Sequence, residues 1–418
     1  MKIQKLNINN IPIFFSKTEK FKTISIQVVL LNKFDKTLST KLSLLTRLMN
    51  NTTKKYCTKR DFVNKLYDLY DASISVYSYP SYKTSINVFS MKIVNENHLS
   101  DKTITEEAIK FLNEVIFNPN FINNEFEQKE FEEEKTRLKE AIERVYDNKN
   151  RYAIRCLLNN MCANEIASVS SLGNLEDLEK ITSKDIYETY KYLIETSNYS
   201  VYVVGDIEEN KLLNNLKCLN FPDNNEIEYE IASDETYSIS KVKEIKEIQN
   251  VNQSILCMGY RNDFNINHPK YYQSLVFCEM FGGGYISDLF KVVREEHSLA
   301  YSIVSQMISD VKLMIVDAGI DKDRYQEVIN IIKEILDNYR NGIIDEDLLE
   351  ISKISLISGI EETEDSAGAY IAYMLRNYLA NEDLTLEEAI NKVSCTTKED
   401  IVEIAKGINL DTILLLSN

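Results

Sequence analysis

The histidines and cysteines of this chain are few, and their spacing does not suit a metal site. Its three histidines are His98, His268 and His297, and no two of them lie three or four positions apart, as two zinc ligands on one helix face would. His98 lies in the turn-like sequence NENHLS, His268 precedes a proline and His297 follows two glutamates, so all three are interpreted as solvated surface residues. The seven cysteines are scattered and contain no CxxC pair, which argues against a cysteine zinc site and a disulfide framework. We therefore expect no metal ion or other cofactor in this chain.

A stronger chemical signal lies in residues 281–301, FGGGYISDLFKVVREEHSLAY. Arg294 carries a guanidinium that stays protonated and Tyr301 carries a phenol, so both side chains can donate hydrogen bonds to a ligand. The alternative is that Arg294 forms a salt bridge on a helix face and that Tyr301 packs in a sheet. The glycine triplet 282–284 is not followed by GK[ST], so a phosphate-binding loop is disfavoured, and a turn that allows a close approach is favoured.

The elements that would position these residues follow a similar order twice along the chain. Apolar alternation and β-branched runs predict strands, whereas apolar residues at i, i+3 and i+4 predict helices. In the first half, strands are expected at 3–7, 11–15, 22–31, 72–79, 84–94 and 199–204, and helices at 38–49, 58–69, 106–116, 125–146, from 151 onward, and at 183–193. In the second half, strands are expected at 254–260, 300–309, 311–320 and 411–416, and helices at 271–280, 287–295 and 323–339, followed by two more helices.

This repetition, at a period of roughly 200–240 residues, predicts two similar domains. The fold class is α+β: each domain is expected to be a mostly antiparallel sheet covered by helices on one face, and the two are expected to form a clamshell. The stretch 221–246 is acidic and poor in apolar residues in its first half, so we interpret it as a linker. The predicted domains are therefore 1–220 and 247–418, and the linker would let them open and close around a peptide.

The composition narrows the classes of ligand and the compartment. The chain has 48 basic and 65 acidic residues, and the resulting net charge of −17 argues against binding to nucleic acid and suits neutral or cationic ligands. No apolar run approaches the roughly 18–20 residues of a membrane span, and the start MKIQKLNINNIPIFF does not resemble a signal peptide. Cysteines such as Cys257 and Cys278 lie in apolar runs, as buried reduced thiols do. These features predict a cytoplasmic protein that binds neither nucleic acid nor membranes.

Residues 281–301 resemble the C-terminal-domain signature of the insulinase/pitrilysin-type zinc peptidases, which is close to GGGxSSRLFxxVREkrGLaYS. The matching residues are Gly282, Gly283, Gly284, Ser287, Leu289, Phe290, Val293, Arg294, Glu295, Leu299, Ala300 and Tyr301. Stretches at 171–182 and 203–207 are similar to the end of the first domain in that family. The resemblance covers essentially the whole chain and implies the same two-domain fold, with one departure at Ser298, where the family usually has glycine.

The catalytic motif of the family is missing from the matching positions. The family carries H-x-x-E-H on a helix, where the two histidines bind Zn²⁺ and the glutamate polarises the metal-bound water. In the matching sequence SLLTRLMNNTT, Ser43 and Arg47 take the histidine positions and Thr46 takes the glutamate position. Ala141 takes the position of the third ligand, although a one-residue slip would put Glu140 there. A fixed positive charge at position 47 opposes Zn²⁺, and a threonine hydroxyl cannot act as a base near neutral pH.

The resemblance implies one half of a two-chain enzyme. In heterodimeric members one subunit carries the metal, and the other can supply an arginine and a tyrosine that hold the backbone carbonyl of the substrate. Arg294 and Tyr301 match that pair, and Gly282, Gly283 and Gly284 match a central loop that approaches the opposing half. We therefore expect a non-catalytic subunit that binds a peptide substrate and pairs with a homologous subunit bearing HxxEH. Zinc is expected only in that partner.

Three alternatives remain open at this point. The family includes a bacterial branch of inactive members that are encoded with an active partner, but the assembly here could be a homodimer instead. The chain could also be a purely structural scaffold, as the peptidase-like core subunits of respiratory complexes are. Finally, it could be a metallopeptidase that acts alone with a degenerate metal site.

Overall fold

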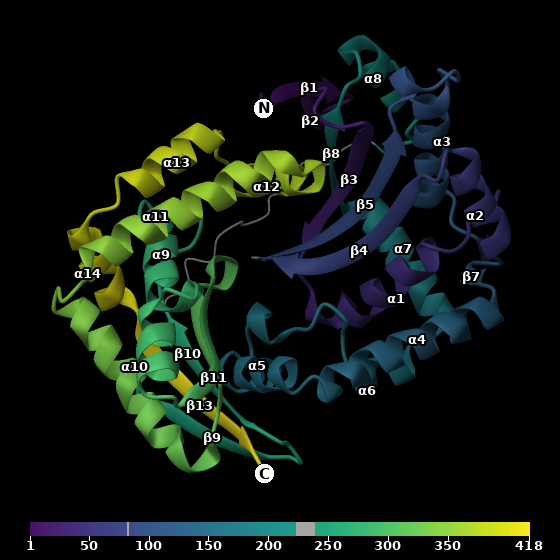
Figure 1. Cartoon of the computed structure of the whole chain (residues 1–418). Helices are drawn as coiled ribbons and strands as arrows, with labels where there is room; N and C mark the ends of the chain where they lie inside the picture. Colours follow the sequence, from purple (N-terminus) through teal and green to yellow (C-terminus); the bar gives the residue numbers. More distant parts are fainter. Residues whose placement is uncertain (82, 223–238) are drawn as a thin grey trace. The chain divides into compact units, whose positions relative to one another are not determined.

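The computed structural model describes residues 1–81, 83–222 and 239–418, which fall into two compact units (Figure 1). Within the described residues, unit 1 contains Met1–Glu143, 169–222 and Thr363–Leu379, and unit 2 contains Arg144–Ser168, 239–362 and Ala380–Asn418. No helix in this described part of the chain is both long enough and apolar enough to cross a membrane.

Unit 1 is built on a six-stranded, mostly antiparallel sheet. In spatial order its strands are β1 (Gln4–Ile8), β2 (Ile11–Lys17), β8 (Asn198–Gly205), β3 (Thr23–Lys33), β5 (Thr84–Val94) and β4 (Ser73–Ser81). The pair of β2 and β8 is parallel. The central strand β3 turns Ile24, Ile26 and Val28 toward the main core of the unit, and its β-branched, apolar sequence suits a strand that is buried on both faces.

Most helices of unit 1 bury their apolar stripes in that core, on one face of the sheet. They are α1 (Ser39–Met49), α2 (Lys59–Asp68), α3 (Ile104–Phe117), α4 (Gln128–Asp147), α6 (Leu175–Lys180), α7 (Ser183–Thr196) and α8 (Glu209–Leu216). A short hairpin of β6 (Phe121–Ile122) and β7 (Glu125–Phe126) precedes α4, so the helix predicted from residue 125 begins three residues later.

The second face of this sheet receives α12 (Ala367–Ala380), a helix from the far end of the sequence. Phe14 on this face stacks on Tyr202, with ring centroids 5.0 Å apart, and also contacts Tyr378 of α12 at 5.1 Å. The Tyr370 hydroxyl donates a hydrogen bond to the carbonyl oxygen of Met1 at 2.6 Å. The N-terminal amine pairs with Glu364, just before α12. These contacts make α12 part of unit 1.

Unit 2 contains a five-stranded sheet with the same general plan. Its spatial order is β11 (Ala300–Ile308), β12 (Leu313–Ile320), β10 (Ser254–Arg261), β13 (Asn409–Ser417) and β9 (Lys243–Ile248). One face is covered by α9 (Tyr271–Cys278), α10 (Tyr325–Arg340), α11 (Glu346–Glu361), α13 (Leu386–Ser394) and α14 (Lys398–Gly407). The other face of β10 and β13 packs against α5 (Lys149–Met161), whose Ala153 and Leu157 lie against Cys257 and Leu414.

A buried ionic cluster joins α5 to the sheet of unit 2. The Arg261 guanidinium donates to Asp411 Oδ2 at 2.9 Å and to the two carboxylate oxygens of Glu165 at 2.7 and 2.9 Å. It also donates to the Met161 carbonyl oxygen at 3.0 Å, at the end of α5. Because these side chains expose only 9–17% of their surface, the charges are largely removed from water.

The α+β prediction is confirmed, and the structure adds one layer to it. Each sheet is mostly antiparallel and helix-covered on one face, but each also receives one helix from the other half of the sequence, α5 or α12. The units therefore differ from the contiguous ranges 1–220 and 247–418. Of the predicted linker 221–246, residues 223–238 lie outside the described residues, and its last four residues belong to β9, which pairs in parallel with β13. The clamshell stays a prediction.

Candidate functional site

Arg294 lies on η5 (Leu289–Glu296), a π-helical segment of unit 2 that leads into β11. The backbone N–H of His297 donates to the Val292 carbonyl at 3.1 Å, the i to i−5 spacing of a π-helix. The Arg294 guanidinium is exposed and lies over the Phe290 ring at 4.5 Å from the ring centroid. Within the part of the chain that the structure describes, Arg294 makes no hydrogen bond or ion pair. Its donors are therefore oriented by the aromatic ring and available to a ligand.

Tyr301 occupies a β-bulge at the start of β11. Ala300 pairs with Ile320 and Ser302 pairs with Gly319, so Tyr301 is an extra residue on its strand. Ala300 and Ile303 both face the core of unit 2, and the bulge between them lets Tyr301 point outward, with 67% of its surface exposed. Without the bulge, Tyr301 would share the side of Ile303 and point into the core. The phenol has no hydrogen-bond partner among the described residues.

The turn between Arg294 and Tyr301 contains a strained residue. Ser298 has a φ of 51°, in the left-handed region that glycine adopts without steric cost. The departure from the family's glycine therefore lies at a position whose backbone favours glycine. The Leu299 N–H donates to the Val293 carbonyl at 2.9 Å and ties the end of this turn back to η5.

We expect Ser298→Gly to raise the free energy of unfolding by about 0.5–1 kcal/mol. A left-handed conformation costs a non-glycine residue roughly 1–2 kcal/mol, which glycine would not lose. The unfolded chain has more entropy with glycine than with serine, and this offsets about half of that stabilisation. Urea denaturation measures the change. Ser298→Ala is the matched control, since it keeps the strain and should not stabilise the protein. A glycine variant that is no more stable than the wild type would contradict the strain.

The glycine loop makes its close approach inside unit 2. Gly282 is buried in η4 (Glu279–Gly283), and a Cβ at this position would lie 2.9 Å from the Ser305 backbone nitrogen on β11 and 2.8 Å from the Leu289 side chain. Gly283 and Gly284 lie beside the Glu279 carboxylate instead. The structure therefore assigns Gly282 the role of docking η4 onto β11. The expected approach of this loop to the opposing half stays a prediction.

The positions that the sequence predicts to match the HxxEH motif lie on α1 in unit 1. Ser43 and Thr46 are buried, and the Thr46 hydroxyl donates to the Ser43 carbonyl at 3.1 Å within the helix. Arg47 is partly exposed. Sequence reasoning missed Asn50, one turn further on, whose side-chain amide exchanges two 2.8 Å hydrogen bonds with the backbone of Val76 on β4. This part of α1 therefore serves to attach the helix to the edge strand of its sheet.

The acidic residues of α4 do not assemble a replacement metal site. Ala141 is partly exposed and Glu140 is exposed. The buried Glu134 pairs with Lys59 at 3.2 Å and with Arg137 at 2.5 Å. Glu130 accepts hydrogen bonds from the Thr52 hydroxyl at 3.0 and 3.1 Å, and burial raises the pKa of its carboxyl. Across the described residues, no three His, Cys, Asp or Glu side chains gather as metal ligands.

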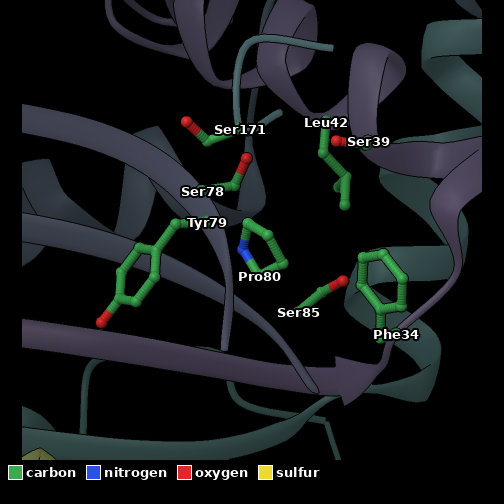
Figure 2. A pocket seen from close by; sticks show the side chains of 8 residues that line it. All are labelled: Phe34, Ser39, Leu42, Ser78, Tyr79, Pro80, Ser85 and Ser171. Carbon is green, nitrogen blue, oxygen red and sulfur yellow. The ribbon is translucent and has the colours of Figure 1, made fainter. Parts of the chain in front are cut away.

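A small pocket near the start of α1 does not provide an alternative site. Its volume is about 10 Å³, which is room for about one water molecule. Figure 2 shows the side chains that line it, from α1, β4, β5 and neighbouring loops: Phe34, Ser39, Leu42, Ser78, Tyr79, Pro80, Ser85 and Ser171. The pocket is too small for a peptide side chain.

Comparisons with known proteins agree with this description of the fold. The family model described as "Peptidase M16 inactive domain" matches residues 180–356. The Bacillus subtilis (strain 168) protein named "Probable inactive metalloprotease YmfF" is 29% identical over 409 residues, which cover 96% of this chain and 94% of that protein. A crystal structure of a conserved protein from Enterococcus faecalis V583 matches with a TM-score of 0.94 at 29% identity, over 100% of this chain and 98% of that one.

A more distant structure shows the same fold. The crystal structure of a peptidase M16 inactive domain from Pseudomonas fluorescens matches with a TM-score of 0.81 at 14% identity, over 100% of this chain and 98% of that one. Serine, threonine and arginine stand at the positions of this chain that the sequence predicts to match HxxEH. The chain is therefore similar, over nearly its whole length, to proteins described as inactive members of the peptidase M16 family.

Proposed function

We propose that this protein is the non-catalytic subunit of a two-chain peptidase, in which a homologous partner supplies the HxxEH zinc site. In this assembly, Arg294 and Tyr301 would hold the backbone carbonyl of a peptide while the partner's metal-bound water attacks it. Zinc would be present only in the partner. The observation that carries the proposal is that both donors are exposed and have no hydrogen-bond partner among the described residues.

The local construction supports a role for these two donors beyond packing. The Phe290 ring orients the guanidinium, and a bulge turns the phenol out of the core. Bulges and π-helical segments are enriched beside functional sites because they redirect side chains at a cost in regular pairing. All seven cysteines are free thiols, as expected of the reducing cytoplasm in which we propose the complex acts.

The test is co-expression with the nearest homologue that carries HxxEH, followed by peptide-cleavage assays of each chain alone and of the pair. We expect only the pair to be fully active. Removing one donor to a developing oxyanion typically lowers kcat by about 100–1000-fold, so Arg294→Ala and Tyr301→Phe should each lower the activity of the pair strongly. Arg324→Ala and Tyr67→Phe are matched controls, because both side chains are exposed and lie outside the site.

Two outcomes would contradict the proposal. If the lone homologue cleaves peptides as well as the pair does, the subunit has no part in cleavage. If the pair is required but Arg294→Ala and Tyr301→Phe leave its activity unchanged, the chain is a scaffold rather than a peptide-binding subunit.

A further inference from the structure

Asp317 carries a half-buried carboxyl in the sheet of unit 2. It lies on β12, and within the described residues it accepts no hydrogen bond and pairs with no cation. Burial raises the pKa of this carboxyl. Carboxyls in such surroundings are usually hydrogen-bonded or paired, because leaving them unsatisfied is costly. A cation brought to this position would therefore find a carboxyl that none of the described residues occupies.

The residues around Asp317 determine from which side a ligand could approach its carboxyl. Cys257 of β10 pairs with Asp317 on one side and is covered by α5. Val304 of β11 pairs with Asp317 on the other side and exposes 45% of its surface. Ser302 and Gln306, which share the face of Val304, are also exposed. On the sheet face that carries Asp317, α5 therefore covers the side toward β10, whereas the side toward β11 is exposed to solvent.

Among the strands that the structure describes, β11 is an edge strand, because it pairs with β12 alone and lies at the end of the sheet. An edge strand presents backbone donors and acceptors to which an extended peptide can add as a further strand. Neighbouring strands lie about 4.8 Å apart, so a peptide residue opposite Val304 would be about 10 Å from Asp317, two strands away. The long stem of a lysine or arginine can lie across an apolar residue and carry its charge over such a distance, whereas a short side chain cannot.

We propose that an extended peptide pairs with β11 and that a lysine or arginine opposite Val304 reaches across to the carboxylate of Asp317. This inference rests on the proposed function and names its substrate class, a peptide with a basic residue at one fixed position. Val304 contacts the aliphatic stem, and Asp317 receives the charged end. The net charge of −17 favours the approach of such a peptide at low ionic strength.

The test measures binding of short, fluorescently labelled extended peptides to the full chain by anisotropy. One peptide carries a single central lysine, and a second carries norleucine there, which keeps the stem and removes the charge. A charge-assisted contact at a half-buried site is expected to give the lysine peptide about tenfold tighter binding. Asp317→Asn, which preserves the shape of the side chain, should abolish this preference. Asp323→Asn is the matched control, since Asp323 is an exposed acid on a separate turn.

The outcomes separate this inference from the proposed function. Equal binding of both peptides by the wild type, no measurable binding of either, or an unchanged preference in Asp317→Asn would overturn it. Arg294→Ala should weaken the binding of both peptides to the same extent and leave the preference for lysine intact. Asp317→Asn should weaken the binding of the lysine peptide only. Methylation of alternate peptide nitrogens should abolish binding if the peptide pairs with β11, and undiminished binding of both methylated forms would exclude that pairing.

Discussion

Arg261→Met is expected to lower the free energy of unfolding by about 3–5 kcal/mol. The substitution leaves Glu165 and Asp411 as buried charges without a cation, and removing one partner of a buried ion pair typically costs that much. It also removes the hydrogen bond to the Met161 carbonyl, which attaches α5 to the sheet of unit 2. Both losses act on the helix that comes from the other half of the sequence.

Urea denaturation followed by circular dichroism measures this effect. Arg324→Met is the matched control: Arg324 pairs with Glu327 on the surface, where ion pairs contribute at most about 1 kcal/mol. Proteolysis should cleave the variant first between 144 and 168, since that segment loses its anchor. If Arg261→Met lowers the free energy of unfolding no more than Arg324→Met does, the ionic cluster does not hold α5 on the sheet.

Gly282→Ala is expected to lower the free energy of unfolding by about 1–3 kcal/mol, the usual cost of inserting a methyl group into a filled core. Its Cβ would lie 2.9 Å from the Ser305 backbone nitrogen, and neither η4 nor β11 can yield without breaking the packing between them. Because β11 also carries Tyr301, we expect peptide binding at the site to weaken along with stability.

Gly359→Ala provides a control of opposite sign. Gly359 lies within α11, where a Cβ would have no neighbour within 4 Å. Alanine should therefore stabilise the helix by about 0.5–1 kcal/mol, through the lower entropy of its unfolded chain. Thermal unfolding of both variants gives the comparison. A neutral Gly282→Ala would show that the loop can move away from β11.

Much of the fold could be predicted because local patterns determine it. The β-branched, apolar run of β3 identifies a buried central strand, and the helical spacing of apolar residues in α1 identifies a buried helix. The exchange of α5 and α12 could not be predicted in this way. An amphipathic stripe shows that a helix buries one face, but it does not identify the sheet that receives that face. The extension of the predicted linker into β9 was missed for a similar reason, since parallel pairing with β13 is a long-range contact.

The candidate site was predicted in its residue types but not in its geometry. The motif identified Arg294 and Tyr301 as candidate site residues. The sequence could not predict that both side chains are exposed. The bulge at Tyr301 depends on a register shift against β12, and the strain at Ser298 depends on the turn that follows η5. Asn50 gave no signal, because an asparagine that bonds to a strand backbone looks like any polar residue at a helix end.

The exchange of helices also determines when the nascent protein can finish folding. The second face of the first sheet, with Phe14 and Tyr202, stays uncovered until α12 has been synthesised and has left the ribosome. Through most of translation this aromatic surface is therefore accessible to chaperones. A gene cut at its midpoint would yield two fragments that each lack a layer, and neither could reach its native state without the other.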